Sequence, residues 1–496
     1  MTDLRPRVQL FTAEQVDRIV ADALRALETV GFAVENEEAI ALLDGAGLEV
    51  EKGHAPAGAA GISVRVRAGE DAVRAALATA PSRIAVCDRD GEPRLDLGGD
   101  AVHYDPGSAA LHLLDPKTRR RHRPKTGDLV HLAWITEACG NYAAQSTSMV
   151  PDDVPEEMGD RWRLYVALLH GRKPVVTGTF RKDAFAVMRA MLTAVRGGEA
   201  ALRERPLAIF DCCPSPPLKW SDLTCQSLID CARAGIPAEL VSMPLGGATA
   251  PVTLREMVVQ HCAENLSGIL IHQLARPGAP IVYGGSPAAF DMRRGTTPMG
   301  AIETMMVDVG YAQVGKQLGL PTHAYMGLSD AKGVDYQTGL ESGAGILLAA
   351  LGGINMVSGA GMLDFENCQS FEKLVLDNEA CGMALRLVRG IDHGSANLAV
   401  DLLREVVEIG SFLGHHHTRA HFRQEQIFPG PAIDRGTYGD WEAAGGSDAC
   451  ERAGAEARRL IAAGPPAPIA PELRRELDGL IRAEARRLKA GELPKM

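Results

Sequence analysis

The segment Thr322-His-Ala-Tyr-Met-Gly-Leu-Ser-Asp-Ala-Lys-Gly-Val-Asp-Tyr-Gln-Thr-Gly-Leu-Glu341 joins a short apolar run to a dense group of polar residues. The apolar run covers 322–328, and the polar group follows it directly. The next 22 residues, 342–363, carry no charge, which predicts a buried helix followed by a buried strand. In α/β proteins the chemistry lies in loops at the ends of buried strands. We therefore expect this segment to carry part of a functional site.

Seven other apolar runs resemble 322–328, and helical patterns separate them. Several begin just after a proline, where a strand tolerates the missing N–H. Eight strands that alternate with helices favour a (β/α)8 TIM barrel over an open doubly wound sheet. The eight predicted strands are 142–146, 174–180, 206–212, 238–243, 280–285, 322–328, 354–358 and 373–376.

The chain divides into three predicted parts. Residues 1–125 predict a cap with a helix over 12–31, short helices over 37–43 and 71–80, and β-hairpins over 102–123. Residues 126–413 predict the barrel. Residues 414–496 predict a helical C-terminal extension, in which the stretch 462–471 is rich in alanine and proline.

Charge and cysteine content narrow the class of protein. The 496 residues carry a net charge of −11, which argues against a general nucleic-acid binder. The basic run 119–125 is either a solvated surface or a docking site for an acidic partner or an anionic cofactor tail. The N-terminus lacks the apolar core of a signal peptide, and the ten cysteines form no C-x-x-C. We expect reduced thiols, a cytoplasmic protein and no membrane span.

Glycine, serine and threonine dominate the predicted strand ends, and ionisable residues are few there. A barrel opening lined by such small, uncharged residues suits the binding of a large flat partner better than it suits a buried hydrolytic site. A rival interpretation is a metal-dependent hydrolase or lyase, since His417, His421 and Glu425 have the spacing H-x-x-x-H-x-x-x-E, which places three ligands on one helical face. The stretch 310–317 has Walker A spacing, but Gln317 replaces the Ser or Thr that binds Mg²⁺.

Four groups of residues resemble the trimethylamine:corrinoid methyltransferase family, including its members that lack pyrrolysine and act on quaternary amines such as glycine betaine. The resemblance covers about residues 10–460. It implies a (β/α)8 barrel and transfer of an N-methyl group to the Co(I) of a corrinoid held by a separate protein. The matching groups are Ser329–Glu341, Gly359–Leu363, Leu374–Glu379, and His421–Glu425 with Asp434, Arg435 and Trp441.

Founding members of this family insert pyrrolysine near the end of the sixth strand, where this chain has standard residues in the window 326–329. The resemblance therefore implies a quaternary amine as substrate. It also implies no tightly bound cofactor, because the partner protein supplies the corrinoid. We further expect a homo-oligomer. A third interpretation is a barrel that binds betaines without catalysis.

The predicted site residues come from these motifs and from the strand ends. Aromatic rings and carboxylates recognise a quaternary ammonium, and Lys332 or Arg423 would bind a substrate carboxylate. The predicted catalytic residues are Asp330 and Glu379, with no metal ligand. The predicted substrate-binding residues are Phe180, Phe210, Tyr283, Tyr325, Tyr336, Lys332 and Asp377, and the predicted cofactor-binding residues are Gly284, Gly285, Ser329, Ser358 and Gly359.

Overall fold

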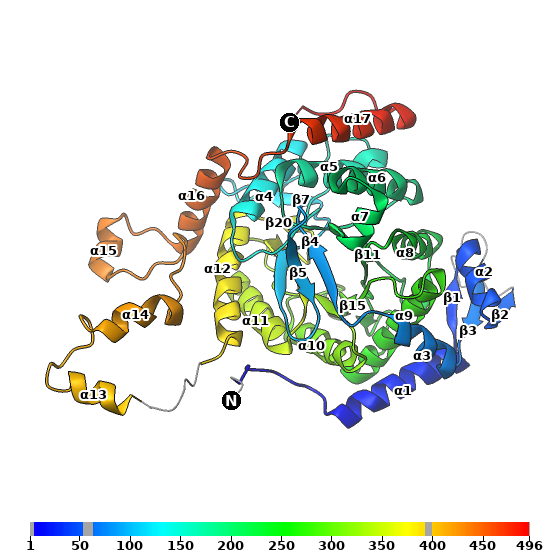
Figure 1. The fold of residues 1–496 in the computed structure, drawn as a ribbon, viewed down its shortest axis with the longest axis horizontal. Coiled ribbons are helices and arrows are strands. Elements are labelled where there is room, and N and C mark those ends of the chain that lie inside the picture. Colours follow the sequence, from blue (N-terminus) through cyan, green and yellow to red (C-terminus); the bar gives the residue numbers. More distant parts are fainter. Residues whose placement is uncertain (1–3, 53–62, 392–398, 496) are drawn as a thin grey trace.

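The computed structural model describes residues 4–52, 63–391 and 399–495, and its centre is a closed barrel of eight parallel strands (Figure 1). A parallel bridge between Tyr104 and Tyr142 brings the first strand beside the last and closes the ring. In spatial order the strands are β6 (His103–Pro106), β18 (Met356–Ala360), β17 (Thr322–Tyr325), β15 (Ile281–Gly285), β13 (Ala238–Leu240), β11 (Ala208–Cys212), β10 (Val175–Gly178) and β9 (Gln145–Ser146).

A long helix follows each barrel strand, as the (β/α)8 prediction requires, so that prediction is confirmed. The uncharged run 342–363 covers the second half of α11 and all of β18, which confirms the predicted helix and strand. In chain order the eight helices are α4 (Thr126–Ala138), α5 (Gly159–His170), α6 (Phe185–Arg196), α8 (Asp222–Ala234), α9 (Leu254–Ala275), α10 (Ile302–Gln317), α11 (Tyr336–Gly352) and α12 (Phe371–Val388).

Seven of the eight predicted runs overlap a barrel strand, and the eighth is wrong. Residues 373–376 belong to α12, whose first turn is capped when the Ser370 side chain accepts from the Lys373 N–H. The missing strand is β6, which has no apolar run because an inward position holds Asp105. Strand β6 lies within the predicted cap 1–125, and the domain boundaries after residues 125 and 413 stay a prediction.

A β-hairpin closes the amino-terminal end of the barrel. Its strands β4 (Ile84–Cys87) and β5 (Pro93–Leu97) lie across the middle of the ring in Figure 1. Four of its side chains pack against inward-facing residues near the starts of the barrel strands, which forms a separate apolar core. This core contains Ile84, Val86, Leu95, Leu97, Ala144, Val176, Ile209, Val282 and Met356.

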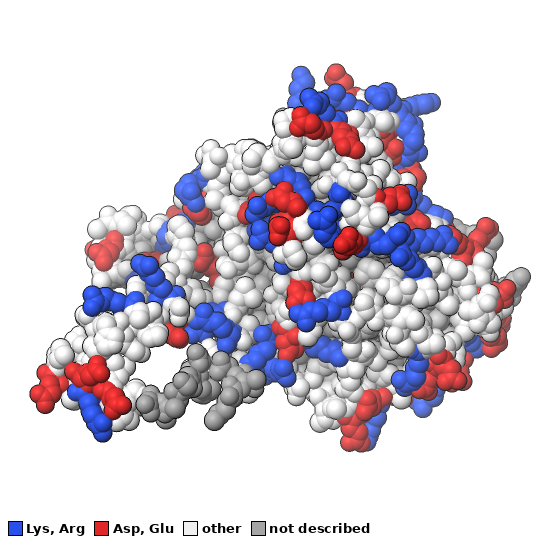
Figure 2. Space-filling model, viewed as in Figure 1, with Lys and Arg blue, Asp and Glu red and all other residues white. Residues whose placement is uncertain are grey.

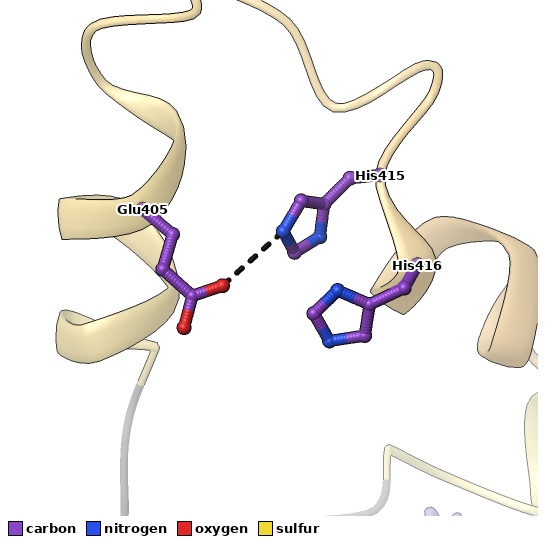
Figure 3. Close-up of side chains that lie close together, drawn as sticks. All are labelled: Glu405, His415 and His416. Atoms are coloured by element: carbon purple, nitrogen blue, oxygen red, sulfur yellow. Dashed lines mark ion pairs between the residues drawn. The ribbon is translucent and has the colours of Figure 1, made fainter.

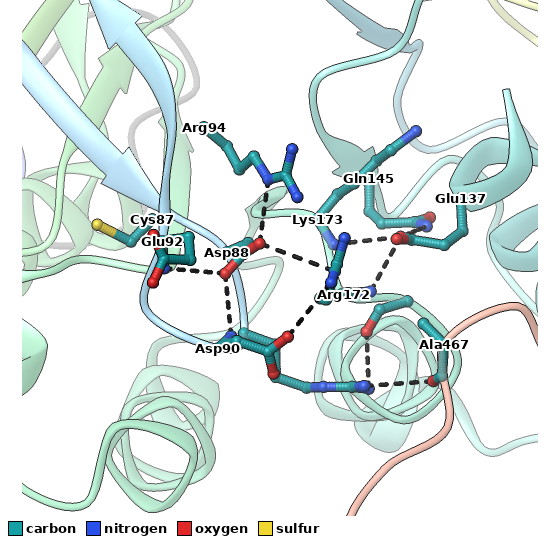
Figure 4. Close-up of polar contacts among 12 residues, drawn as sticks. Cys87, Asp88, Asp90, Glu92, Arg94, Glu137, Gln145, Arg172, Lys173 and Ala467 are labelled. Carbon is teal, nitrogen blue, oxygen red and sulfur yellow. Dashed lines mark hydrogen bonds and ion pairs between the residues drawn. The ribbon is translucent and has the colours of Figure 1, made fainter. Parts of the chain in front are cut away.

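Polar contacts order the turn of this hairpin and tie it to neighbouring segments (Figure 4). Asp88 accepts from the backbone N–H of Asp90 and Glu92 and from Arg94 Nε. Arg89 donates to the carbonyl oxygens of Gly171 and Ala467, so the hairpin is also tied to the C-terminal segment. Buried charges with several partners hold a single geometry, and the hairpin is therefore a fixed part of the barrel end.

The N-terminal elements pack outside the barrel and chiefly against α9. The helix predicted over 12–31 is present, and Thr12 caps it in a box with Gln15. Both predicted short helices are present as well. These elements are α1 (Ala13–Thr29), β1 (Phe32–Val34), α2 (Glu37–Gly45), β2 (Glu49–Lys52), β3 (Val64–Arg67) and α3 (Glu70–Thr79), and β12 (Lys219–Trp220) extends their sheet.

Short strands build up the carboxyl-terminal end of the barrel. One sheet there has the order β19 (Met362–Leu363), β20 (Cys368–Gln369), β7 (His112–Leu114) and β8 (Arg121–His122), and a second pairs β14 (Leu245–Gly246) with β16 (Ala288–Ala289). The antiparallel pair β7–β8 confirms one hairpin predicted within 102–123.

The C-terminal extension is helical, as predicted. Helices α16 (Ala449–Ala462) and α17 (Pro471–Leu488) pack on the barrel against α12 and α6, respectively. Before them, α13 (Val400–Val406), α14 (His416–Glu425) and α15 (Tyr438–Ala443) form an arm that projects away from the barrel in Figure 1. We call residues 399–443 the arm.

Both charge signs intermingle on the face shown in Figure 2. In the described part of the chain, no helix combines the length and the apolar character that a bilayer crossing requires.

Candidate functional site

The barrel interior contains a chain of polar side chains. Strand residues alternate between the barrel interior and the helix layer, and this alternation directs Glu239, His323 and Ser358 inward. His323 Nε2 lies 3.2 Å from Ser358 Oγ and 3.2 Å from Glu239 Oε1. Ser358 Oγ donates to Asp105 Oδ1 at 2.6 Å. TIM barrels normally fill these layers with branched apolar residues, so a buried acidic set points to function.

Burial sets the protonation states of these polar side chains in the barrel interior. It lowers the pKa of His323 to about 3 and raises that of Glu239 well above its ordinary value, so both are neutral and their contact is not an ion pair. Burial also raises the pKa of Asp211 to about 6, and the nearby Asp211 carboxyl adds to the rise in the pKa of Glu239.

A cavity of about 340 Å³ lies next to these polar side chains, at the carboxyl-terminal ends of the barrel strands. We call it the mouth cavity. Its volume falls within the range of small-ligand sites, and it lies where TIM-barrel enzymes place their active sites. Its lining includes Ser108 after β6, Gly178 at the end of β10, Asp211 of β11, Val241 after β13, Ser286 after β15 and Tyr325 at the end of β17.

Arg163, Phe180 and Tyr325 give this cavity its chemical character. Arg163, on α5, donates through Nε and Nη2 to the Thr147 carbonyl at 3.2 and 2.6 Å, and its Nη1 has no partner among the described residues. The Phe180 ring is 56% exposed and lies 5.0 Å from the Arg163 guanidinium carbon. The cavity thus offers aromatic faces, carboxyl groups and one guanidinium.

Glu366 completes the lining from an unusual backbone turn. Residues 364–367 connect β19 to β20, and Asp364, Phe365 and Glu366 have φ of +53°, +58° and +68°. Left-handed backbone costs a non-glycine residue roughly 1–2 kcal/mol. Three such residues in a row mark a strained turn, and strain of this kind concentrates at functional sites.

Two of the predicted substrate-binding residues, Phe180 and Tyr325, meet at the mouth cavity. Two others point the opposite way. Phe210 and Tyr283 are both fully buried in the helix layer, where Phe210 packs on Phe185 at 5.3 Å and Tyr283 on His261 at 5.5 Å. Their predicted position at the mouth is wrong, because the alternation in β11 and β15 directs their neighbours inward.

Three predicted residues lie on a second cavity of about 580 Å³ between α11, α12 and the C-terminal extension: Tyr336, Asp377 and Glu379. Glu379 accepts from the Gly430 N–H at 2.9 Å, and Asp377 accepts from the Gly361 N–H at 2.8 Å. Because 373–376 is helical, Asp377 and Glu379 are not at a strand end, and that expectation is wrong. Their binding and catalytic roles stay predictions.

Asp330 and Lys332 both have structural partners. Asp330 Oδ1 accepts from the backbone N–H of Met299 and Gly300 at 2.9 and 3.0 Å. Burial raises the pKa of Asp330 to about 6. Lys332 Nζ lies 3.4 Å from Asp364 Oδ1 and 3.7 Å from the centre of the Phe365 ring. The segment 322–341 thus contacts the strained turn.

The five predicted cofactor-binding residues do not line the mouth cavity. Ser329 Oγ donates to Glu341 Oε2 at 2.6 Å, and Ser358 belongs to the buried chain. A Cβ on Gly284 would lie 2.8 Å from the Leu240 carbonyl oxygen, and one on Gly285 would collide with His261. Gly359, at φ +157°, packs on the Met326 carbonyl. Close packing accounts for these glycines, and contact with a corrinoid stays a prediction.

The structure gives little support to the alternative metal site of His417, His421 and Glu425. Glu425 pairs with Arg386 at 3.2 Å and does not join His417 and His421, whose rings lie 4.5 Å apart. Within the described ranges, the residues whose ligand atoms gather within 4.8 Å are Glu405, His415 and His416 (Figure 3). The His417 N–H donates to His415 Nδ1, which leaves the proton of the neutral ring on Nε2, directed at Glu405. A metal would need that nitrogen unprotonated.

The sequence interpretation missed five residues of this site: Asp105, Arg163, Glu239, His323 and Glu366. The predicted residues come from strand ends and motifs, whereas Asp105, Glu239 and His323 lie within strands. The signal for Glu239 was present, since a lone carboxyl between Ala238 and Leu240 interrupts an apolar strand. Arg163, on α5, and Glu366, in a turn, carry no such signal because their burial depends on the tertiary fold.

Known proteins similar to this chain include methylamine and betaine methyltransferases. Trimethylamine methyltransferase MttB of Desulfitobacterium hafniense is 30% identical over 471 residues, which covers 95% of this chain and 93% of that protein. Glycine betaine methyltransferase from another strain of that species is 28% identical over 483 residues, with 97% and 98% covered. The crystal structure of Methanosarcina barkeri monomethylamine methyltransferase MtmB aligns with 90% of this chain and 98% of its own, with a TM-score of 0.48 and 11% identity.

The model of one protein family, trimethylamine methyltransferase (MTTB), matches residues 1–489. Because this match covers almost the whole chain, the protein belongs to the trimethylamine methyltransferase (MTTB) family.

Proposed function

We propose that this protein transfers a methyl group from a quaternary, betaine-like amine to the Co(I) of a corrinoid carried by a separate partner protein. The observation that supports this most is the mouth cavity, which combines the Phe180 and Tyr325 rings with the Asp211 and Glu366 carboxyls. Aromatic faces and carboxylates are the groups that recognise a quaternary ammonium. Both glycine betaine and trimethylamine methyltransferases are among its relatives.

The proposed reaction requires positioning more than proton transfer. The N–CH3 bond breaks and its electron pair stays on nitrogen, so the amine leaves as a neutral tertiary amine. The acceptor supplies the electron pair for the new bond to the methyl carbon. No general acid is required. The cavity walls would hold the methyl group in line with the acceptor and exclude water.

The position of Arg163 in the mouth cavity favours binding of a substrate that carries a carboxylate. Its guanidinium is buried and lines the same cavity as the carboxyl groups, and Nη1 has no partner in the described part of the chain. A buried donor without a partner is costly, and a substrate carboxylate would supply that partner. This assigns to Arg163 the role that was predicted for Lys332 or Arg423.

A substrate panel tests the proposal. The protein is incubated with a Co(I) corrinoid protein and glycine betaine, proline betaine, carnitine, choline or trimethylamine, and methylcobalt absorbance is followed. We expect methylation with at least one betaine. Absence of methylation with every amine contradicts the proposal. Calorimetric binding of a betaine without transfer would instead favour a non-catalytic binding barrel, and stoichiometric metal in the pure protein would favour the metal-dependent enzyme.

We also propose that the protein is a homo-oligomer whose arm packs on a second copy of the chain. Helices α14 and α15 bury none of their residues, and Val407, Leu413 and Phe428 are 74%, 88% and 62% exposed. Short helices without a buried face are marginal in water. A second copy is the expected cover, because most oligomers are symmetric homo-oligomers.

Analytical ultracentrifugation tests this arrangement. The double variant Leu413→Asp, Phe428→Asp should sediment as a smaller species than the wild type, because both charges fall on the proposed interface. Val252→Asp is the control, since Val252 is 68% exposed on the barrel and outside the arm. A monomeric wild type at micromolar concentration contradicts the proposal.

A further inference from the structure

We propose that Glu366 is the ammonium-recognition residue of the mouth cavity, held there by a clamped left-handed turn, and that it releases its proton when a permanently charged cation binds. This inference rests on the proposed function, in which the substrate is a quaternary amine. It assigns a role to a residue that the sequence motifs do not include.

The position of Glu366 is the first argument. It is at the tip of the β19–β20 hairpin, in the sheet that extends the barrel mouth, and its side chain lines the mouth cavity together with Asp211 and Tyr325. The Ser108 N–H approaches Glu366 Oε1 at 3.5 Å, a long and weak contact. Within the described part of the chain, the carboxyl therefore has few protein partners in a cavity that it helps to form.

The clamp on the turn is the second argument. Asp364 pairs with Arg121 at 2.7 Å and with Lys332 at 3.4 Å, and the Lys332 ammonium lies over the Phe365 ring. The Asp364 N–H also donates to the Ala331 carbonyl at 2.9 Å. Two cations from separate segments, 121 and 332, thus hold an unfavourable backbone in place. This arrangement directs the Glu366 side chain toward the barrel axis.

The electrostatic surroundings are the third argument. Burial is the main cause that raises the pKa of Glu366 to about 8, and the Asp211 carboxyl adds to the effect. The other titratable or charged groups that face it are Asp105 of β6, Arg163 of α5, Cys213 after β11 and Tyr325 of β17. At neutral pH the carboxyl is therefore mostly protonated when the cavity holds no cation.

Binding of a quaternary ammonium changes this balance. A permanent positive charge near the carboxyl favours its ionised form and lowers its pKa. The O–H bond breaks, the proton passes to solvent or buffer, and the carboxylate pairs with the cation. By linkage, the affinity for such a cation should rise with pH, by about tenfold per pH unit at most, and level off above the pKa of about 8.

Calorimetry with the full-length protein tests this directly. Choline and glycine betaine are titrated at pH 7 in buffers of different ionisation enthalpy, which gives the number of protons released. We expect about one proton for wild type. Glu366→Gln should release almost none, and its affinity should vary little between pH 7 and 9. The uncharged choline isostere 3,3-dimethylbutan-1-ol should bind wild type without proton release.

Glu372→Gln is the matched control. Glu372 is a buried carboxyl on α12 that contacts Ser370 and does not line the mouth cavity. This variant should keep both proton release and affinity. Thermal unfolding of both variants checks that a lost signal does not come from misfolding, and Glu366→Asp provides a second variant that keeps the charge. It should retain part of the pH-dependent affinity.

The outcomes separate this inference from the proposed function. If cations bind wild type without proton release, or if Glu366→Gln keeps the release, the role of Glu366 is wrong and methyl transfer is unaffected. If cations bind with release but no amine methylates the corrinoid, the role stands and the catalytic proposal fails. If no quaternary cation binds, both fail.

Discussion

The Tyr325 hydroxyl donates a hydrogen bond to Asp211 Oδ2 at 3.1 Å, and so joins β17 to β11 at the mouth of the barrel. Asp211 Oδ1 has no partner among the described residues. One oxygen of this carboxyl is thus held by the protein and the other remains available. Hydrogen bonds to a carboxylate favour its ionised form, so Tyr325 keeps the pKa of Asp211 from rising further than burial alone would raise it.

Tyr325→Phe should raise the pKa of Asp211 above its value of about 6. Loss of a hydrogen bond to a charged group costs about 1.5–3 kcal/mol, which corresponds to an upward shift of about one pH unit or more. Cation affinity should therefore fall at pH 6.5 and recover by pH 9. Calorimetric titrations across this range measure the shift, and Tyr438→Phe, at an exposed ring of the arm, is the control.

Phe180→Ala should weaken binding of quaternary amines by about 3- to 30-fold, since a cation–π contact contributes about 0.5–2 kcal/mol. The ring is 56% exposed, so the melting temperature should change little. Tyr336→Ala removes a ring of the second cavity and is the comparison. If Tyr336→Ala weakens binding and Phe180→Ala does not, the substrate binds between α11 and α12.

Asp330 should act on stability more than on catalysis, contrary to the catalytic role expected from its motif. Asp330→Ala leaves the Met299 and Gly300 N–H groups without an acceptor, which should cost about 1–3 kcal/mol in the free energy of unfolding. Asp330→Asn keeps an acceptor oxygen and should retain stability. Urea unfolding and the turnover of corrinoid methylation, measured on both variants, separate the two roles. Weakened turnover in a fully stable Asp330→Asn would support catalysis.

The pH dependence of stability gives a second check on Asp330. Its pKa rises from 3.8 to about 6 on folding, so the folded state binds more protons than the unfolded state in this range. The free energy of unfolding therefore falls as pH rises from about 4 to 6. Asp330→Asn should lose this part of the dependence, as urea midpoints at several pH values would record. An unchanged dependence would contradict the assigned pKa.

Lys332 is expected to act through Glu366 as a positioning residue. Lys332→Met removes the ion pair with Asp364 and the contact with the Phe365 ring. The strained turn should then relax, which would weaken cation affinity and flatten its rise between pH 7 and 8. Lys332→Arg should restore most of both properties. A Lys332→Met variant with an unchanged pH profile would show that Arg121 and the backbone hydrogen bond suffice.

The barrel was predictable from sequence because parallel strands buried on both faces are continuous apolar runs. Strand β6 was missed for the complementary reason. Its inward position holds Asp105, so β6 has no apolar run, and the apolar stretch 373–376 was assigned in its place. The site prediction failed in the same way at Phe210 and Tyr283, where a strand-end position was used without the inside–outside alternation.

Other parts of the site depend on contacts between distant segments. The strained turn is held by residues 121 and 332, and Arg163 reaches the cavity from α5. Each pairing joins residues that lie far apart in the chain, and a single sequence contains no record of them. The segment 322–341 lies at the end of the sixth predicted strand, as expected, but Tyr325 is its one residue that lines the mouth cavity, and its polar residues lie beside that cavity.

The β4–β5 hairpin has a consequence for the order in which the amine and the partner protein bind. With its apolar core filling the amino-terminal end of the barrel, the mouth cavity has its entrance at the opposite end. Under the proposed function, the amine, the methyl acceptor and the demethylated product would share the entrance at that end. A large protein docked there would block it. The amine would then have to enter before the partner docks, and the product would leave only after undocking, so steady-state kinetics should show compulsory-order binding and inhibition by excess partner.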